Sequence, residues 1–103
     1  MKKINFVGQA DFLPTSDTVD VRVLAANTAE RHTIPAGSAF VLAASSSDFY
    51  IRWHNSSDAS IPAADVTDGS GAEYKPGLRN IAGLTSFSII APATAVVSLA
   101  FFS

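Results

Sequence analysis

The residues of this chain that are able to do chemistry are two histidines, several carboxylates and many serines. A zinc site would need His32 and His54 to converge with a carboxylate such as Asp48 or Glu30. Their spacing matches no metal-ligand pattern, and both histidines alternate with apolar residues, which favours side chains on a strand face over metal ligands. We therefore expect no bound metal.

Nucleophilic catalysis finds no support in the local motifs. A serine–histidine–aspartate triad is assembled in space, so an inventory of serines and aspartates does not indicate one. The sequence contains no G-x-S-x-G elbow, no phosphate-binding G-x-x-x-x-G-K-S/T loop and no G-x-G-x-x-G after a strand. We expect no catalytic residue, no cofactor and no enzymatic activity, and keep a small hydrolase or metal-dependent enzyme only as a rival hypothesis.

The acidic segment 65–73 has some features of a calcium-binding loop, because hard cations take several carboxylates and carbonyls from a tight turn. However, Gly69 occupies the third ligand position of such a loop, and Asp68 comes one place too early. An Asx-type turn with glycines accounts for the pattern. We expect Asp65, Asp68 and Glu73, with the adjoining Tyr74, to form a polar rim that faces a partner.

Tyr50 and Trp53 flank Arg52 in a segment that is a candidate platform for stacking on a sugar or a peptide. Residues three apart in an extended strand face opposite sides, and the apolar neighbours of Trp53 place it in the core. This leaves Tyr50 as a single exposed aromatic residue. A carbohydrate- or receptor-binding module that uses Tyr50, His54 and the 65–73 segment stays an alternative function.

Composition limits the protein to a single domain, residues 1–103. The chain has 103 residues, of which 48% are hydrophobic and 16% charged, and it has no cysteine and a formal net charge of −2. Such a chain folds around one core, has no disulfide framework and is a poor partner for nucleic acid. The longest apolar stretch, residues 89–102, is too short and interrupted for a membrane helix, and residues 1–9 lack the apolar run of a secretory signal.

Alternation with a period of two dominates the chain and predicts strands. In residues 18–24 three valines share one face and Asp20 and Arg22 the other, the pattern of a half-buried antiparallel strand. Turns are expected at 35–37 and 92–93, and a long loop at about 55–80. The fold class predicted is all-β, a small antiparallel β-sandwich (jelly-roll-like) or a barrel of about seven to eight strands. The other expected strands are residues 4–7, 30–34, 38–44, 48–54, 85–91 and 94–102. Residues 74–75 and 78–81, within the loop region, are candidates for a further short strand each.

The last two expected strands form a hairpin in this interpretation, and both of its faces are apolar. One face carries Phe87, Ile89, Val97, Leu99 and Phe101, and the other carries Ile90, Val96, Ala100 and Phe102. Water does not favour a second exposed apolar face, so something must cover it. The cover is either a neighbouring copy in a symmetric homo-oligomer or the loop 55–80 of the same chain.

Four segments resemble small virion proteins of tailed bacteriophages. They are residues 48–53 (DFYIRW), 61–70 (IPAADVTDGS), 82–93 (AGLTSFSIIAPA) and 96–102 (VVSLAFF). The resemblance covers residues 48–103 and consists of an aromatic strand with a basic residue, an acid-and-glycine turn and a closing strand pair. It implies a structural subunit, either a capsid decoration (cement) protein or a neck or tail accessory, and it transfers no catalytic residue.

The resemblance and the expected hairpin with two apolar faces together predict a self-associating protein, with a trimer favoured. Its partners would be the major capsid protein or other virion proteins, and its location the virion, assembled in the host cytoplasm. Membrane and nucleic-acid partners are not expected. The residues expected at the self-association or shell contact are Ile90, Val96, Phe102, Tyr50 and Arg52.

Overall fold

The computed structural model describes residues 15–53 and 57–103, and in these ranges it contains eight strands and no helix. No helix in the described ranges is therefore long and apolar enough to cross a membrane. The strand expected at residues 4–7 lies outside them. The strands are β1 (Thr18–Leu24), β2 (Glu30–Thr33), β3 (Phe40–Ser45), β4 (Tyr50–Arg52), β5 (Glu73–Tyr74), β6 (Leu78–Asn80), β7 (Ser86–Ile90) and β8 (Ala95–Phe102).

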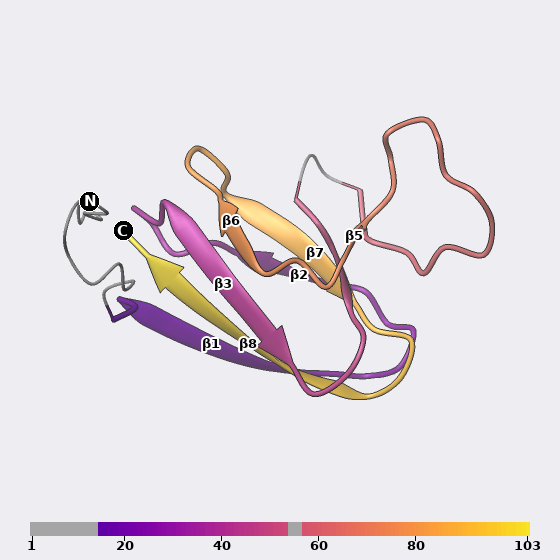
Figure 1. The fold of residues 1–103 in the computed structure, drawn as a ribbon, viewed down its shortest axis with the longest axis horizontal. Coiled ribbons are helices and arrows are strands. Elements are labelled where there is room, and N and C mark those ends of the chain that lie inside the picture. Colours follow the sequence, from indigo (N-terminus) through magenta and orange to yellow (C-terminus); the bar gives the residue numbers. More distant parts are fainter. Residues whose placement is uncertain (1–14, 54–56) are drawn as a thin grey trace, which may run out of the picture.

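The strands form two antiparallel sheets that pack face to face, as Figure 1 shows. One sheet has the order β1-β8-β3-β6 and the other β2-β7-β4-β5. From β1 to β4 and from β6 to β8 the chain changes sheet at each step, and this strand order is that of an eight-stranded jelly roll. The predicted all-β sandwich of jelly-roll type is confirmed.

The predicted hairpin between the last two strands is wrong. β7 pairs with β2 and β4, whereas β8 pairs with β1 and β3, so the two strands lie in different sheets. The segment between them crosses from one sheet to the other, and the buried side chains of Ala91 and Ala95 mark that crossing. The apolar residues that seemed to face each other within a hairpin meet across the core instead.

The core lies between the inner faces of the two sheets, where the alternating residues of each strand meet. Phe87 and Ile89 of β7 and Val97, Leu99 and Phe101 of β8 belong to one buried cluster. The other members of the cluster are Leu24, Ile34, Val41, Phe49, Ile51, Ile81, Ala91 and Ala95.

The expected turn at 35–37 is present, and Gly37 has a positive φ of 82°, which a residue without a side chain adopts at little cost.

In strand β1 the apolar side chains lie on the outer face of the sandwich, whereas an alternating strand usually turns its apolar side chains towards the core. Val19, Val21 and Val23 are 53%, 59% and 67% exposed, whereas Leu24 is fully buried. Since successive side chains alternate between faces, the inward position of Leu24 also places Asp20 and Arg22 on the inner side. Their opposite residues in β8 are the core residues Leu99 and Val97.

Candidate functional site

The outer face of the β1-β8-β3-β6 sheet is the most unusual surface of the described residues. Apart from Asn80 at the end of β6, its side chains at exposed positions are aliphatic, and we call the large ones among them the outer apolar face. It consists of Val19, Val21, Val23, Leu42, Leu78 and Val96. Exposed single hydrophobic residues are ordinary, but a contiguous group of them marks a contact surface.

The strand register makes this group continuous, because residues directly opposite each other in an antiparallel ladder share a face. One row crosses all four strands, from Val19 through Ala100 and Leu42 to Leu78. Beside it, Val23 of β1 lies opposite Val96 of β8. The positions between these rows are small, with Val21 opposite Ser98 and Ser98 opposite Ala44. The register assigns no charged residue to this face within the described ladders.

Of the expected contact residues, Val96 lies on the outer apolar face. Ile90 and Phe102 are only 6% and 7% exposed, so they are covered within the chain and are not offered to a partner. The sequence interpretation missed the valines of β1 together with Leu42 and Leu78. Alternation shows that the three valines share a face, but only the pairing of β1 with β8 shows that this face points outward.

Part of the outer face of the other sheet is covered by the segment after β4. Ala59 is buried against it, and its N–H donates a 2.8 Å hydrogen bond to the Oγ of Ser88, which is itself fully buried. Arg31 of β2 donates to the Ser57 carbonyl at 2.6 Å and holds the same segment. Ile90 lies two residues beyond Ser88 on this face, directly opposite Tyr50 of β4, and is buried within the chain.

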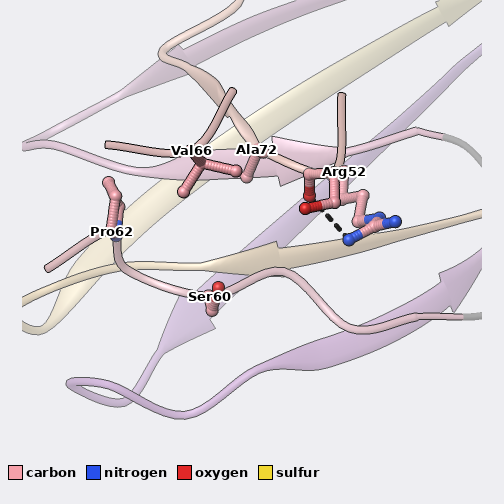
Figure 2. Close-up of a pocket in the computed structure, with 7 residues that line it drawn as sticks. Arg52, Ser60, Pro62, Val66 and Ala72 are labelled. Carbon is pink, nitrogen blue, oxygen red and sulfur yellow. Dashed lines mark hydrogen bonds between the residues drawn. The ribbon is translucent and has the colours of Figure 1, made fainter. Parts of the chain in front are cut away.

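A shallow pocket of about 290 Å³ lies between this segment and β4 (Figure 2). Arg52 closes one side of it, and its Nη1 donates to the Ser70 carbonyl at 2.6 Å. The remaining lining residues are Ser60, Pro62, Val66, Ser70, Gly71 and Ala72. Arg52 therefore fixes the loop from within, and the lining contains no pair of groups arranged for acid–base chemistry.

The acidic segment 65–73 has two parts: a turn at Asp68, and the side chain of Glu73, which forms hydrogen bonds within the molecule. Asp68 accepts hydrogen bonds from the N–H of Ser70 at 3.0 Å and from its hydroxyl at 2.6 Å, which confirms the predicted Asx-type turn. These bonds lower the pKa of the Asp68 carboxyl. Asp65 is exposed on the same loop. Glu73, by contrast, binds within the molecule, where it accepts from Trp53 Nε1 at 3.0 Å and from Arg79 Nε at 2.8 Å.

Tyr50 and Tyr74 form an aromatic pair on the β2-β7-β4-β5 sheet. Their ring centroids are 5.3 Å apart, and Tyr74 is 54% exposed. The Tyr74 hydroxyl donates a 2.8 Å hydrogen bond to Asp48, which raises the pKa of the phenol. The sequence interpretation placed Tyr50 among the contact residues and Tyr74 in the polar rim of the loop, and it did not foresee that their rings pack together.

The histidines do not form a ligand set in the described ranges. His32 Nε2 lies 2.8 Å from Glu30 Oε1, and its ring packs against Phe87 with centroids 5.8 Å apart. His54 lies outside the described residues. Among those residues no group of three or more histidine, aspartate and glutamate side chains converges as a metal site would require.

Glu73 gives a first prediction, on pH dependence. The Arg79 guanidinium, followed by the Trp53 N–H, lowers the pKa of the Glu73 carboxyl below its usual value. Ionised Glu73 therefore stabilises the fold above the ordinary glutamate pKa of about 4.3, and this contribution is lost as pH falls through the lower folded value. We expect wild type to lose stability on acidification more steeply than Glu73→Gln in urea unfolding between neutral pH and the acid range. Equal slopes would contradict this.

The chain is thus a jelly-roll β-sandwich with one outer sheet face partly covered by its own loop and the opposite outer face apolar. No family model, no curated protein and no solved structure matches it. The observation from which a function can be argued is the outer apolar face.

Proposed function

We propose that this protein is a structural subunit of a tailed-bacteriophage virion, a decoration or cement protein that is present in repeated copies and binds the capsid shell. The observation that carries the proposal is the outer apolar face, which runs across four strands. Fully burying a valine or leucine side chain contributes about 1.5–3 kcal/mol, so several such residues on one rigid sheet supply the core of a stable contact. Jelly-roll sandwiches recur in capsid proteins, which is support by analogy.

The test compares two valines of similar exposure on opposite sides of the sandwich. Val96 is 44% exposed on the outer apolar face, and Val66 is 48% exposed on the loop that covers the other sheet. Val96→Lys is expected to weaken binding to purified capsid shells by about tenfold or more, because a lysine charge would be buried at the contact. Val66→Lys is expected to bind as wild type does, and both variants should unfold at the wild-type temperature.

Shell binding that is equal in both variants would exclude the outer apolar face as the docking surface. The number of copies per particle, measured by quantitative mass spectrometry of purified virions, distinguishes a subunit of the shell from a subunit of the neck or tail. Copies in proportion to the major capsid protein support the shell, few copies per particle support a neck or tail accessory, and absence from the virion contradicts the proposal.

The Tyr50–Tyr74 pair favours a second candidate, a carbohydrate- or receptor-binding module. Exposed aromatic rings offer an apolar face to a sugar, and the adjacent Asp48 carboxylate accepts hydrogen bonds. Under this hypothesis a glycan array gives selective binding that Tyr74→Ala abolishes and Val96→Lys leaves unchanged. The two candidates therefore predict opposite sensitivities for the same pair of variants.

A further inference from the structure

We infer that two copies of this chain pair through the open edge of β1, antiparallel and about a two-fold axis at Val21, so that their four-stranded sheets join into one continuous sheet. This goes beyond the proposed function, because it concerns the edge of β1 and not the docking of the outer apolar face on a shell. It specifies a dimer, whereas the trimer expected from the sequence stays untested.

β1 is an edge strand with little protection. It is seven residues long, contains no proline, and is paired only with β8 among the described strands. Edge strands expose a row of backbone donors and acceptors, and proteins usually blunt them with proline, bulges, short length or charged side chains. The range 18–24 contains no proline, its register with β8 is unbroken from Thr18 to Leu24, and its two charged residues, Asp20 and Arg22, have opposite signs.

The backbone of the three valines faces the open edge. The Val96 carbonyl accepts from Ser46 N, which follows β3, and the Phe101 carbonyl accepts from Asp17 N, on the β1 side. Since backbone groups alternate sides along a strand, Val97, Leu99 and Phe101 turn theirs towards β1. The residues opposite them turn theirs towards β8. Val19, Val21 and Val23 therefore direct their N–H and C=O groups away from β8 and towards a partner.

Charge selects one register. With Val21 opposite Val21 of the second copy, Asp20 lies opposite Arg22 of that copy, and Arg22 opposite its Asp20. A shift of two residues in one direction sets Asp20 against Asp20, and in the other direction Arg22 against Arg22. Opposite charges directly across a ladder stabilise it and like charges destabilise it. Shifts by a single residue fail because they mismatch the outward backbone groups.

The guanidinium of Arg22 has fewer hydrogen-bond acceptors in the single chain than it has donors to satisfy. Its Nη2 lies 3.4 Å from Asp20 of the same strand, which is long for such a pair, and its buried Nε has no hydrogen-bond partner. Buried side-chain donors are rarely left without a partner. A second carboxylate directly across the strand pair gives the guanidinium an additional acceptor.

The same register places valine against valine on the outer side. Val21 meets Val21, and Val19 meets Val23, which are β-branched cross-strand pairs of the kind that favours sheets. The outer apolar face of one copy thereby continues into that of the other. The pairing would thus double the apolar platform without covering it.

Cysteine cross-linking tests the geometry directly, because the chain contains no cysteine of its own. Opposed residues that share ladder hydrogen bonds have Cα atoms about 5.5 Å apart, within the roughly 4.4–6.8 Å that a disulfide spans. Val21→Cys is expected to form a covalent dimer almost completely under oxidised glutathione. Val96→Cys, equally on the outer face but one strand further from the axis, is expected to stay monomeric on a non-reducing gel.

A charge exchange tests the register. Asp20→Arg and Arg22→Asp each place like charges across the axis, so each variant is expected to dimerise about tenfold or more weakly than wild type in analytical ultracentrifugation. A mixture of the two variants places every arginine opposite an aspartate, and is expected to form heterodimers. Arg79→Asp, the same charge change on the other edge strand of the sheet, is expected to keep the wild-type mass.

A wild-type protein that stays monomeric at high micromolar concentration, with no Val21→Cys cross-link, would overturn the inference and leave shell binding intact. More efficient cross-linking at Val96→Cys than at Val21→Cys would also overturn it, since that result indicates that two outer apolar faces stack on each other. Dimerisation of both single charge variants at wild-type strength would reject the register.

Discussion

Replacing Phe87 by alanine is expected to lower the free energy of unfolding by about 3–5 kcal/mol, the largest stability effect of the substitutions considered. Phe87 is 1% exposed at the centre of the molecule. Its ring packs with those of Trp53 and His32, each with a centroid separation of 5.8 Å. The truncation removes buried apolar surface and leaves a cavity between two sheets whose backbones are fixed by their ladders, so the site collapses little.

Small domains have a total stability of about 5–15 kcal/mol, so Phe87→Ala removes a large part of it. Urea unfolding followed by far-ultraviolet circular dichroism measures the loss independently of the single tryptophan beside the mutation. Phe87→Leu keeps part of the buried volume and should cost clearly less. Tyr74→Ala removes a ring of similar size from a half-exposed site and should cost less than half as much. A Phe87→Ala loss no larger than that of Tyr74→Ala would show that the core is not centred on this ring.

The fold class was predictable because it depends on local pattern. The sequence pattern located all eight strands of the described residues to within about two residues at each end, a precision typical of strand boundaries. It placed β5 one residue late, at 74–75, where the structure has Glu73–Tyr74. Asp68 and Ser70 likewise form the turn that their sequence indicates, because an Asx turn needs no partner from elsewhere in the chain.

Strand pairing and the direction of each face were not predictable, because both depend on distant residues. A proline turn between two apolar strands is compatible with a hairpin and with a crossing to the opposite sheet, and Pro92 stands at a crossing. The valines of β1 and the residues Asp20 and Arg22 were correctly assigned to two faces. Which face is inner follows from Leu24 and from the register with β8.

The candidate site was predictable only in part for the same reason. Val96 was identified because the final strand is apolar on both sides, and it is exposed as that interpretation requires. Ile90 has the same sequence signal but lies in the other sheet, where it is buried. The apolar positions that the sequence interpretation assigned to one hairpin therefore lie on two sheets, and the outer side of β8 is the one that belongs to the outer apolar face.

The second large effect is expected at Ser88, because the loop cover depends on it. The Ser88 hydroxyl is fully buried and accepts the hydrogen bond of the buried Ala59 N–H. Ser88→Ala leaves that N–H without an acceptor, which costs about 1–3 kcal/mol when no water replaces it. We expect this loss of unfolding free energy, together with faster hydrogen exchange of the Ala59 amide, because the segment around residue 59 opens locally.

Ser86→Ala is the matched control for this prediction. Ser86 lies on the same strand and the same face, but its hydroxyl accepts an exposed 3.2 Å hydrogen bond from Arg31, so its loss should be small. Opening of the loop in Ser88→Ala would expose Ala59 and the sheet surface beneath it, and the variant is expected to bind an apolar dye and to aggregate at concentrations where Ser86→Ala stays soluble. If the two variants are equally stable and equally protected at Ala59, the loop is not the cover of this sheet.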